Sequence, residues 1–303
     1  MTSKPRPDSA IVEKRTACKL PHPPQLDEAH LRLDSVVGTS CALHAYSPVD
    51  KTFCPQNPNA PVFVLIPGLG MDAVGFIRQL PLGTLAELHL FQTPNDRHIE
   101  EDGLDCFARH VEEYIRARKL EKRSGGIILG GCSMGGAVSL RVASRAKIKL
   151  RGLVLLGTFG NCMHLPGWQR MAAPLARLLP LNLARKVVHQ LVARTSHFGR
   201  VTQSEAEWLV SCKLPHTRDY FNRAVMSLTR QNQLEAAALI KTPTLVLHGT
   251  DDKVLPHAAG LELSKTIPGS KMVTVPDSGH AFFFTHHEII NAAIAQFIDE
   301  LTA

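Results

Sequence analysis

The most constraining feature of this sequence is a series of short, continuously apolar runs of strand length. The first, Val62 to Ile66, is stopped by Pro67 and Gly68. Comparable runs follow at Leu88 to Phe91, Ile127 to Leu129, Leu153 to Leu156, Thr244 to Leu247 and Met272 to Val275. Strands that are apolar at every position are typical of parallel sheets covered on both faces. The runs therefore predict a buried, mostly parallel sheet.

The segments between these runs have helical spacing. Cys106 to Lys119, Met134 to Ala146 and Ile289 to Leu301 repeat apolar residues every three or four positions. Alternation of strands and helices predicts an α/β fold with right-handed crossovers and helices on both faces of the sheet. Ahead of the first run, the alternating segments Leu31 to Leu33 and Cys41 to Tyr46 predict an antiparallel hairpin.

One interval breaks the alternation of strands and helices. From Phe159 to about Ala238 the sequence contains amphipathic helical segments and no strand-like run, and an interval of roughly eighty residues is too long for an ordinary loop. We therefore predict three parts: an N-terminal arm at residues 1–30, an α/β core formed by residues 31–157 and 241–303, and a helical cap inserted at residues 158–240.

Composition excludes several other classes of protein. Hydrophobic residues make up 44% and charged residues 20%, which is ordinary for a globular chain. No apolar stretch reaches the roughly 18 residues of a transmembrane helix, and no signal-like run precedes Leu31, so we expect a cytoplasmic protein. The seven cysteines lack a C-x-x-C pair, which favours buried thiols over a zinc site or a disulfide framework.

The net charge of +7 is concentrated in the predicted cap. Residues 158–240 contain ten Lys or Arg against four Asp or Glu, and Arg177 and Arg185 are among them. The aromatic residues there are not interleaved regularly enough for a base-stacking surface, so no nucleic-acid partner is predicted. Two interpretations stay open: a solvated helical face, or a surface that attracts an anionic substrate or an acyl carrier.

A G-x-S-x-G motif at Gly131, Ser133 and Gly135 lies between a predicted buried strand and a predicted helix. Glycine two positions before and after the serine allows neighbouring backbone to approach a strained turn that exposes the hydroxyl. The helix that begins at Met134 directs its positive end at this serine. The motif alone is weak, but its place between strand and helix indicates a nucleophile.

Two later loops offer the partners that a nucleophilic serine requires. Asp251 and Asp252 follow the strand that ends near Leu247, and His280 follows the strand that ends at Val275. An imidazole must accept the proton of the serine, and a carboxylate must orient the imidazole. All three groups follow parallel strands, whose carboxyl ends bind ligands in open α/β sheets.

With these motifs the chain resembles the α/β-hydrolase superfamily over residues 31 to 303. The G-x-S-M-G-G sequence from Gly131 to Gly136 is similar to that of the capped esterase, haloperoxidase-like and carbon-carbon hydrolase group. The family motif H-G-x-x-D-x-x-x-P matches from His248 to Pro256, so the resemblance gives the role of the acid to Asp252. The family's final G-H pair matches Gly279 and His280.

The resemblance also implies an oxyanion hole formed by the backbone amides of Leu69 and Met134. The sequence departs from the family at two places near this hole. Pro67 stands where the family usually has histidine, and the segment from Gln92 to Asp96 replaces an acidic D-x-x-G-x-G turn.

Each candidate residue has a competing interpretation. Ser133 could serve only as a helix N-cap, and Asp251 could replace Asp252 as the partner of His280. His286 and His287 are rival histidines, although both fall at a helix start. Cys132 is expected to be a small buried residue of the turn, and His248 is expected to pack beneath the sheet end, with no metal ligand cluster beside it.

The sequence thus predicts a serine hydrolase that cleaves a carboxylic ester or thioester through an acyl-enzyme, with Ser133 as nucleophile, His280 as base and Asp252 as the orienting acid. No metal or organic cofactor is implied. Two alternatives stay open. The same residues could cleave a carbon-carbon bond or catalyse a lyase step, or the scaffold could be a non-catalytic ligand receptor.

Overall fold

The computed structural model describes residues 20–39, 41–94, 103–165, 201–212 and 217–303, together with residues 167, 170 and 183. The predicted N-terminal arm lies mostly outside these ranges. Its described end contributes Leu20 and Leu26, which pack against the core, and a short 3-10 helix, η1 (Glu28–His30). The basic residues Arg177 and Arg185 also lie outside the described residues.

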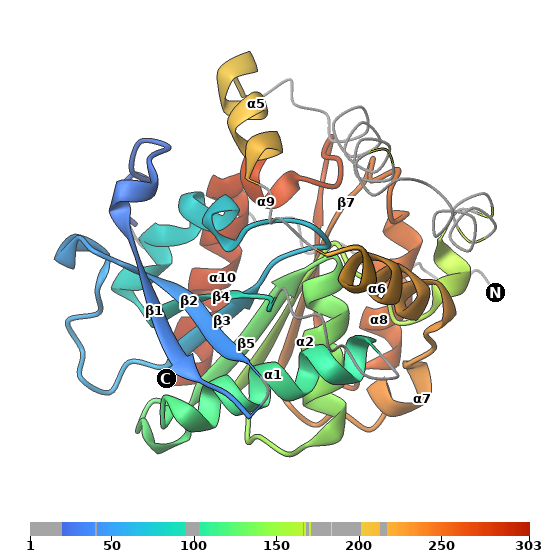
Figure 1. Ribbon diagram of the computed structural model, residues 1–303, viewed down its shortest axis with the longest axis horizontal. Helices are drawn as coiled ribbons and strands as arrows, with labels where there is room; N and C mark the ends of the chain where they lie inside the picture. The colour runs from blue at the N-terminus through green and yellow to red at the C-terminus, as the bar shows by residue number, and fades with distance from the viewer. Residues whose placement is uncertain are drawn as a thin grey trace, which may run out of the picture.

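A single eight-stranded sheet forms the centre of the molecule, in the order β1-β2-β4-β3-β5-β6-β7-β8 (Figure 1). The pairs β1–β2 and β2–β4 are antiparallel, and all other neighbours are parallel. The strands are β1 (Leu31–Val37), β2 (Ala42–Pro48), β3 (Val62–Ile66), β4 (Glu87–Gln92), β5 (Ile127–Cys132), β6 (Gly152–Leu156), β7 (Thr244–Gly249) and β8 (Lys271–Val275). This topology confirms the predicted α/β fold and the antiparallel hairpin.

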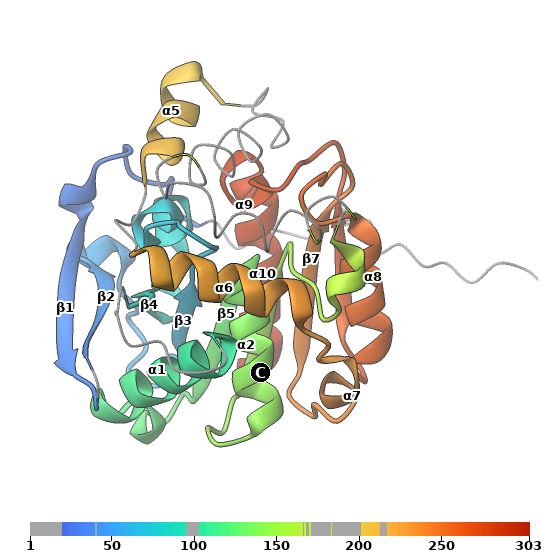
Figure 2. The same ribbon diagram turned by 45° about the vertical axis from the view of Figure 1, so that its right-hand side comes forward.

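Helices cover both faces of this sheet (Figures 1 and 2). On one face lie α1 (Gly103–Ala117), α2 (Met134–Arg145) and α8 (His257–Thr266). On the other lie the 3-10 segment η3 (Ala73–Thr84), α9 (Phe282–Thr285) and α10 (His287–Thr302). Each of these two faces of the sheet has its own cluster of buried hydrophobic residues. Successive residues of β3 pack alternately in one cluster and in the other, so a strand in this position must be apolar at every residue.

Only helices, short 3-10 turns and one isolated β-bridge occur in the described part of the predicted cap, residues 158–165, 201–212 and 217–240. The elements there are η5 (Cys162–His164), α5 (Gln203–Ser211), α6 (Arg218–Arg230) and α7 (Leu234–Ala237). This composition agrees with an all-helical insertion, while the boundaries of the cap remain a prediction.

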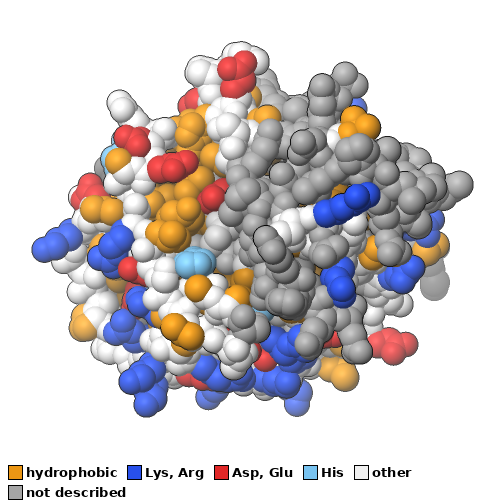
Figure 3. Space-filling view, in the orientation of Figure 1, with side chains coloured by type: hydrophobic (Ala, Val, Ile, Leu, Met, Phe, Trp, Pro, Cys, Tyr) orange, Lys and Arg blue, Asp and Glu red, His pale blue; other side chains and the backbone are white. Residues whose placement is uncertain are grey.

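Two contacts join the helices of this region to the sheet layers. The ring of Tyr220 of α6 packs at a tilt of 55° against Phe107 of α1, with ring centroids 5.1 Å apart, and its hydroxyl donates to Thr93 Oγ1 at 3.1 Å. Trp208 of α5 stacks on Phe284 of α9 at 6.1 Å. Hydrophobic side chains gather below α5 on the face shown in Figure 3.

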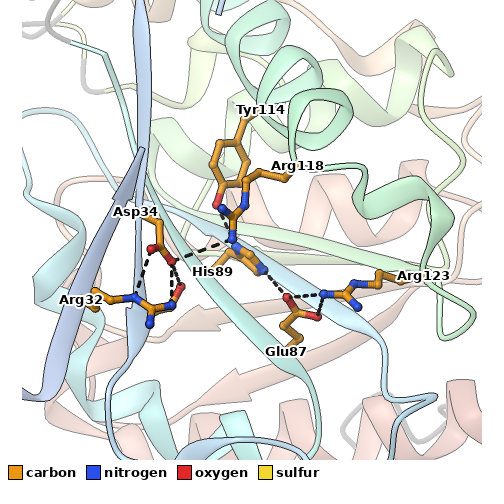
Figure 4. A network of polar contacts seen from close by, with 8 residues as sticks. Arg32, Asp34, Glu87, His89, Tyr114, Arg118 and Arg123 are labelled. Carbon is orange, nitrogen blue, oxygen red and sulfur yellow. Dashed lines mark hydrogen bonds and ion pairs between the residues drawn. The ribbon is translucent and has the colours of Figure 1, made fainter. Parts of the chain in front are cut away.

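A polar network ties β1, β4 and α1 together at one edge of the sheet (Figure 4). The buried ring of His89 contacts Tyr114 Oη through Nδ1 at 2.8 Å and Glu87 Oε1 through Nε2 at 3.2 Å. The hydrogen bond from His89 lowers the pKa of Glu87, as does the charge of Arg123. An ionised Glu87 only accepts, so Nε2 of His89 carries the proton and Nδ1 accepts from the Tyr114 hydroxyl.

This network generates a stability prediction. In Tyr114→Phe, His89 Nδ1 would keep its burial and lose its donor, so we expect the free energy of unfolding to fall by about 1–2 kcal/mol in urea denaturation. The control is Arg32→Ala, which breaks the ion pair of Arg32 with Asp34 at a side chain 67% exposed and should cost about 0.5 kcal/mol or less. Equal losses in both variants would contradict this account of the network.

Candidate active site

Ser133 occupies a strained turn between β5 and α2. Its backbone has φ 52° and ψ −117°, a conformation that costs a residue with a side chain on the order of 1–3 kcal/mol. Its backbone N donates to Leu156 O at 2.9 Å, and its backbone O accepts from Thr158 Oγ1 at 2.7 Å and from Ala137 N of α2 at 3.1 Å. The Ser133 side chain makes no capping hydrogen bond to α2, so the structure does not support the alternative role of a helix N-cap.

The glycines of the G-x-S-x-G motif lie where backbone segments meet. A Cβ on Gly135 would lie 2.1 Å from Ile66 O, and one on Gly131 would lie 2.4 Å from the carbonyl carbon of Gly135. The turn therefore packs directly against the end of β3, which no larger residue would allow. A Cβ on Gly68 would lie 3.4 Å from Ser133 Cβ, so the loop after β3 borders the serine.

Asp252 and His280 form a hydrogen-bonded pair on the loops after β7 and β8. His280 Nδ1 lies 2.7 Å from Asp252 Oδ2, while Asp252 Oδ1 accepts from the amides of Val254 and Leu255, both at 2.9 Å. Burial acts to raise the pKa of Asp252, but His280 and His248 outweigh it and hold this pKa well below its usual range. Because the carboxylate only accepts, Nδ1 of His280 carries a proton and donates it to Asp252 Oδ2.

Ser133 and this pair both lie against the end of β6. Ser133 N binds Leu156 O, and a Cβ on the next residue, Gly157, would lie 3.6 Å from Asp252 Oδ2. The Ser133 hydroxyl has no hydrogen-bond partner among the described residues. The structure therefore brings the three predicted residues to one edge of the sheet, with Asp252 and His280 in direct contact.

Leu69 lies in the loop after β3 that borders Ser133, and Met134 directly follows the serine. Leu69 follows Gly68, and Met134 is the first residue of α2, whose N–H has no acceptor within the helix. Neither amide has a protein acceptor in the ranges that the structure describes. The departure at Gln92 is accommodated locally, since its Oε1 accepts from the amide of Ala73 at 2.9 Å and fixes the start of η3.

The rival residues have other surroundings. Asp251 is exposed, and its amide donates to Ser278 O. His286 is buried beside Thr285, and His287 begins α10 beside Arg78. Burial raises the pKa of the Cys132 thiol to about 12, so this cysteine is not a nucleophile near neutral pH.

One contact of the site was not predicted from the sequence. His248, expected only to pack beneath the sheet, has Nε2 3.5 Å from Asp252 Oδ2. The only sequence feature that pointed to this contact was the spacing of four residues between His248 and Asp252. Among the described residues, no group of three potential metal ligands occurs and no helix is long and apolar enough to cross a membrane.

Comparison with known proteins agrees with this architecture. The chain belongs to the alpha/beta hydrolase family, whose sequence profile matches residues 63–293. The AB hydrolase superfamily protein YisY of Bacillus subtilis is 27% identical over 210 residues, which cover 67% of this chain and 76% of YisY. A solved structure of an esterase from Thermogutta terrifontis shares the fold, with a TM-score of 0.73 at 18% identity, over 90% of this chain and 100% of the esterase.

The named activities of the relatives differ. A pimeloyl-acyl-carrier-protein methyl ester esterase of Aromatoleum aromaticum is 27% identical over 179 residues, which cover 53% of this chain and 69% of the esterase. Others are named as a 2-hydroxymuconate semialdehyde hydrolase and a non-heme bromoperoxidase. Membership of the family thus establishes a hydrolase fold without selecting one reaction.

The geometry generates a prediction that separates the two aspartates. Asp252→Asn should lower kcat by about 10⁴-fold, because an amide at this position would favour the wrong tautomer of His280. Asp251→Asn is the matched control, and it should leave kcat within about twofold because the Asp251 side chain is exposed. Steady-state kinetics on one substrate measures both, and similar losses at the two positions would contradict the assignment.

Proposed function

We propose that this protein is a serine hydrolase that cleaves a carboxylic ester or thioester through an acyl-enzyme. The observation that carries the proposal is the hydrogen-bonded Asp252–His280 pair, whose carboxylate lies beside Gly157, the residue after the one that binds the strained turn of Ser133. A serine hydroxyl is a weak nucleophile unless a neighbouring base accepts its proton, and the orientation of His280 leaves Nε2 available for this step.

The proposed reaction has two halves. Ser133 Oγ attacks the acyl carbon while its proton passes to His280 Nε2, and the amides of Leu69 and Met134 stabilise the oxyanion that forms. His280 then gives the proton to the leaving alcohol or thiol, and the bond to the leaving group breaks. A water molecule, deprotonated by His280, attacks the acyl-enzyme, and the acid product leaves Ser133. Asp252 stabilises the imidazolium in both halves.

Two observations support an ester or thioester as the substrate class. The family includes a relative named as a methyl ester esterase, and that relative's ester is attached to an acyl carrier protein. The basic excess of residues 158–240 supports an anionic substrate or carrier, and α6 presents Arg223 and Arg230 as exposed members of it. The alternative of carbon-carbon cleavage uses the same residues, so the test must include both kinds of bond.

The test is an activity panel of p-nitrophenyl esters of increasing chain length, acyl thioesters and vinylogous diketones. We expect turnover of esters or thioesters, and a loss of at least about 10³-fold in kcat/KM in Ser133→Ala. Ser144→Ala is the control, because Ser144 lies on the same helix and bonds only the carbonyl of Arg141.

The outcome decides between the candidate functions. Turnover confined to the diketones, abolished in Ser133→Ala, would replace ester hydrolysis by carbon-carbon cleavage. Ester turnover that survives in Ser133→Ala would refute the role of the serine.

A further inference from the structure

His248 lies at the end of β7 with its side chain fully buried. Its Nε2 lies 2.8 Å from the carbonyl oxygen of Leu255 and 3.5 Å from Asp252 Oδ2. A carbonyl oxygen only accepts hydrogen bonds, so Nε2 of His248 carries a proton. That proton faces the carbonyl of Leu255, at the end of the Asp252–Leu255 turn, and the carboxylate of Asp252, at its start.

Packing fixes the ring of His248 in this position. On one side a Cβ at Gly260 of α8 would lie only 2.5 Å from Nδ1, so the helix approaches the ring as closely as its backbone allows. On another side Phe282 of α9 stacks against it, with centroids 6.5 Å apart and an interplanar angle of 16°. Two titratable groups face the ring directly: the carboxylate of Asp252 and the ring of His257 of α8, which lies edge-on with its centroid 5.9 Å from that of His248. A third, His280, is linked to His248 through the Asp252 carboxylate.

The contacts of Asp252 connect its carboxylate to the turn that His248 binds. The amides of Val254 and Leu255 hold Oδ1, and both belong to the turn whose last carbonyl His248 binds. Oδ2 is then directed to His280 Nδ1 on one side and to His248 Nε2 on the other. The carboxylate that meets His280 is thus held by the same turn whose last carbonyl His248 binds.

We propose that His248 is a positioning residue, which holds the Asp252–Leu255 turn so that Asp252 Oδ2 meets His280 Nδ1. The inference deepens the proposed function and rests on it for its kinetic consequence. His248 does not touch the reacting atoms. It acts through Asp252, and a loosened turn would lengthen the Asp252–His280 hydrogen bond and misalign the base.

The experiment compares His248→Leu with His248→Gln. Leucine fills part of the volume but has no donor, whereas the glutamine amide nitrogen can reach the place of Nε2 and donate to the Leu255 carbonyl. His257→Gln is the matched control, because it removes a neighbouring imidazole that does not contact Asp252. The first readout is the ¹H NMR resonance of the His280 Nδ1 proton, which lies far downfield while its bond to the carboxylate is short and which needs no substrate.

In His248→Leu we expect the downfield resonance of His280 to move upfield or disappear. We also expect kcat to fall about 10- to 100-fold with KM nearly unchanged, because a small misplacement of a catalytic group costs this much. His248→Gln should restore both the resonance and most of kcat, and His257→Gln should change neither.

An unchanged resonance and kcat in folded His248→Leu, or a glutamine variant no better than leucine, would overturn the proposal. If the leucine variant does not fold, His248→Asn takes its place, since the shorter amide cannot reach the Leu255 carbonyl, and the same comparison with glutamine decides. The resonance is independent of catalysis. If the proposed function is wrong, the original protein will show the His280 resonance but no ester turnover. If the present inference is wrong, the resonance will not move in the His248 variants.

Discussion

The site depends on one backbone constraint, the strained turn at Ser133. A residue with a side chain adopts φ 52° and ψ −117° only where its surroundings hold it there. Here Leu156 at the end of β6 and Thr158, two residues beyond it, each hydrogen-bond the backbone of Ser133, and the end of β3 packs against the glycines on either side of the serine. The strands β3, β5 and β6 therefore hold the turn of Ser133 together, at the middle of a sheet that is covered on both faces.

The order of the strands in the sheet also brings the carboxylate of Asp252 to the imidazole of His280. Because β6, β7 and β8 are neighbours and parallel, the loops that follow them meet at one edge, and Asp252 reaches His280 from the next strand. Burial acts to raise the pKa of this carboxylate, but His280 and His248 hold the pKa low, and two amides bind its other oxygen. A negative charge fixed behind the imidazole favours a proton on Nδ1 and prepares Nε2 to accept another.

The sequence predicted those parts of the fold whose pattern is local. Each residue of Val62–Ile66 packs in one of two clusters, so the run is apolar throughout and is recognisable without any knowledge of its neighbours. Ser133, Asp252 and His280 could be proposed from the sequence for a similar reason, because each lies within a few residues of a strand end. The structure pairs Asp252 with His280 as the motif spacing suggested.

Features that depend on distant partners were not predicted. The segment η3 (Ala73–Thr84) contains Pro81, and the amide of its first residue, Ala73, donates to the side chain of Gln92 on β4. The pairing of β2 with β4 joins segments more than forty residues apart, and Arg78 reaches Glu205 of α5 from η3. The sequence placed His248 and Asp252 in one motif but did not predict their contact, because this contact arises from the folding of the turn between them.

The central claim is that Ser133 is the nucleophile of a hydrolase that works through a covalent intermediate. The most direct measurement is the reaction of the folded protein with a fluorophosphonate, followed by peptide mass mapping of the adduct. This account predicts a single adduct, on Ser133, formed much more slowly in a variant that lacks the His280 imidazole. An adduct on another residue, or no adduct on folded protein, would contradict it.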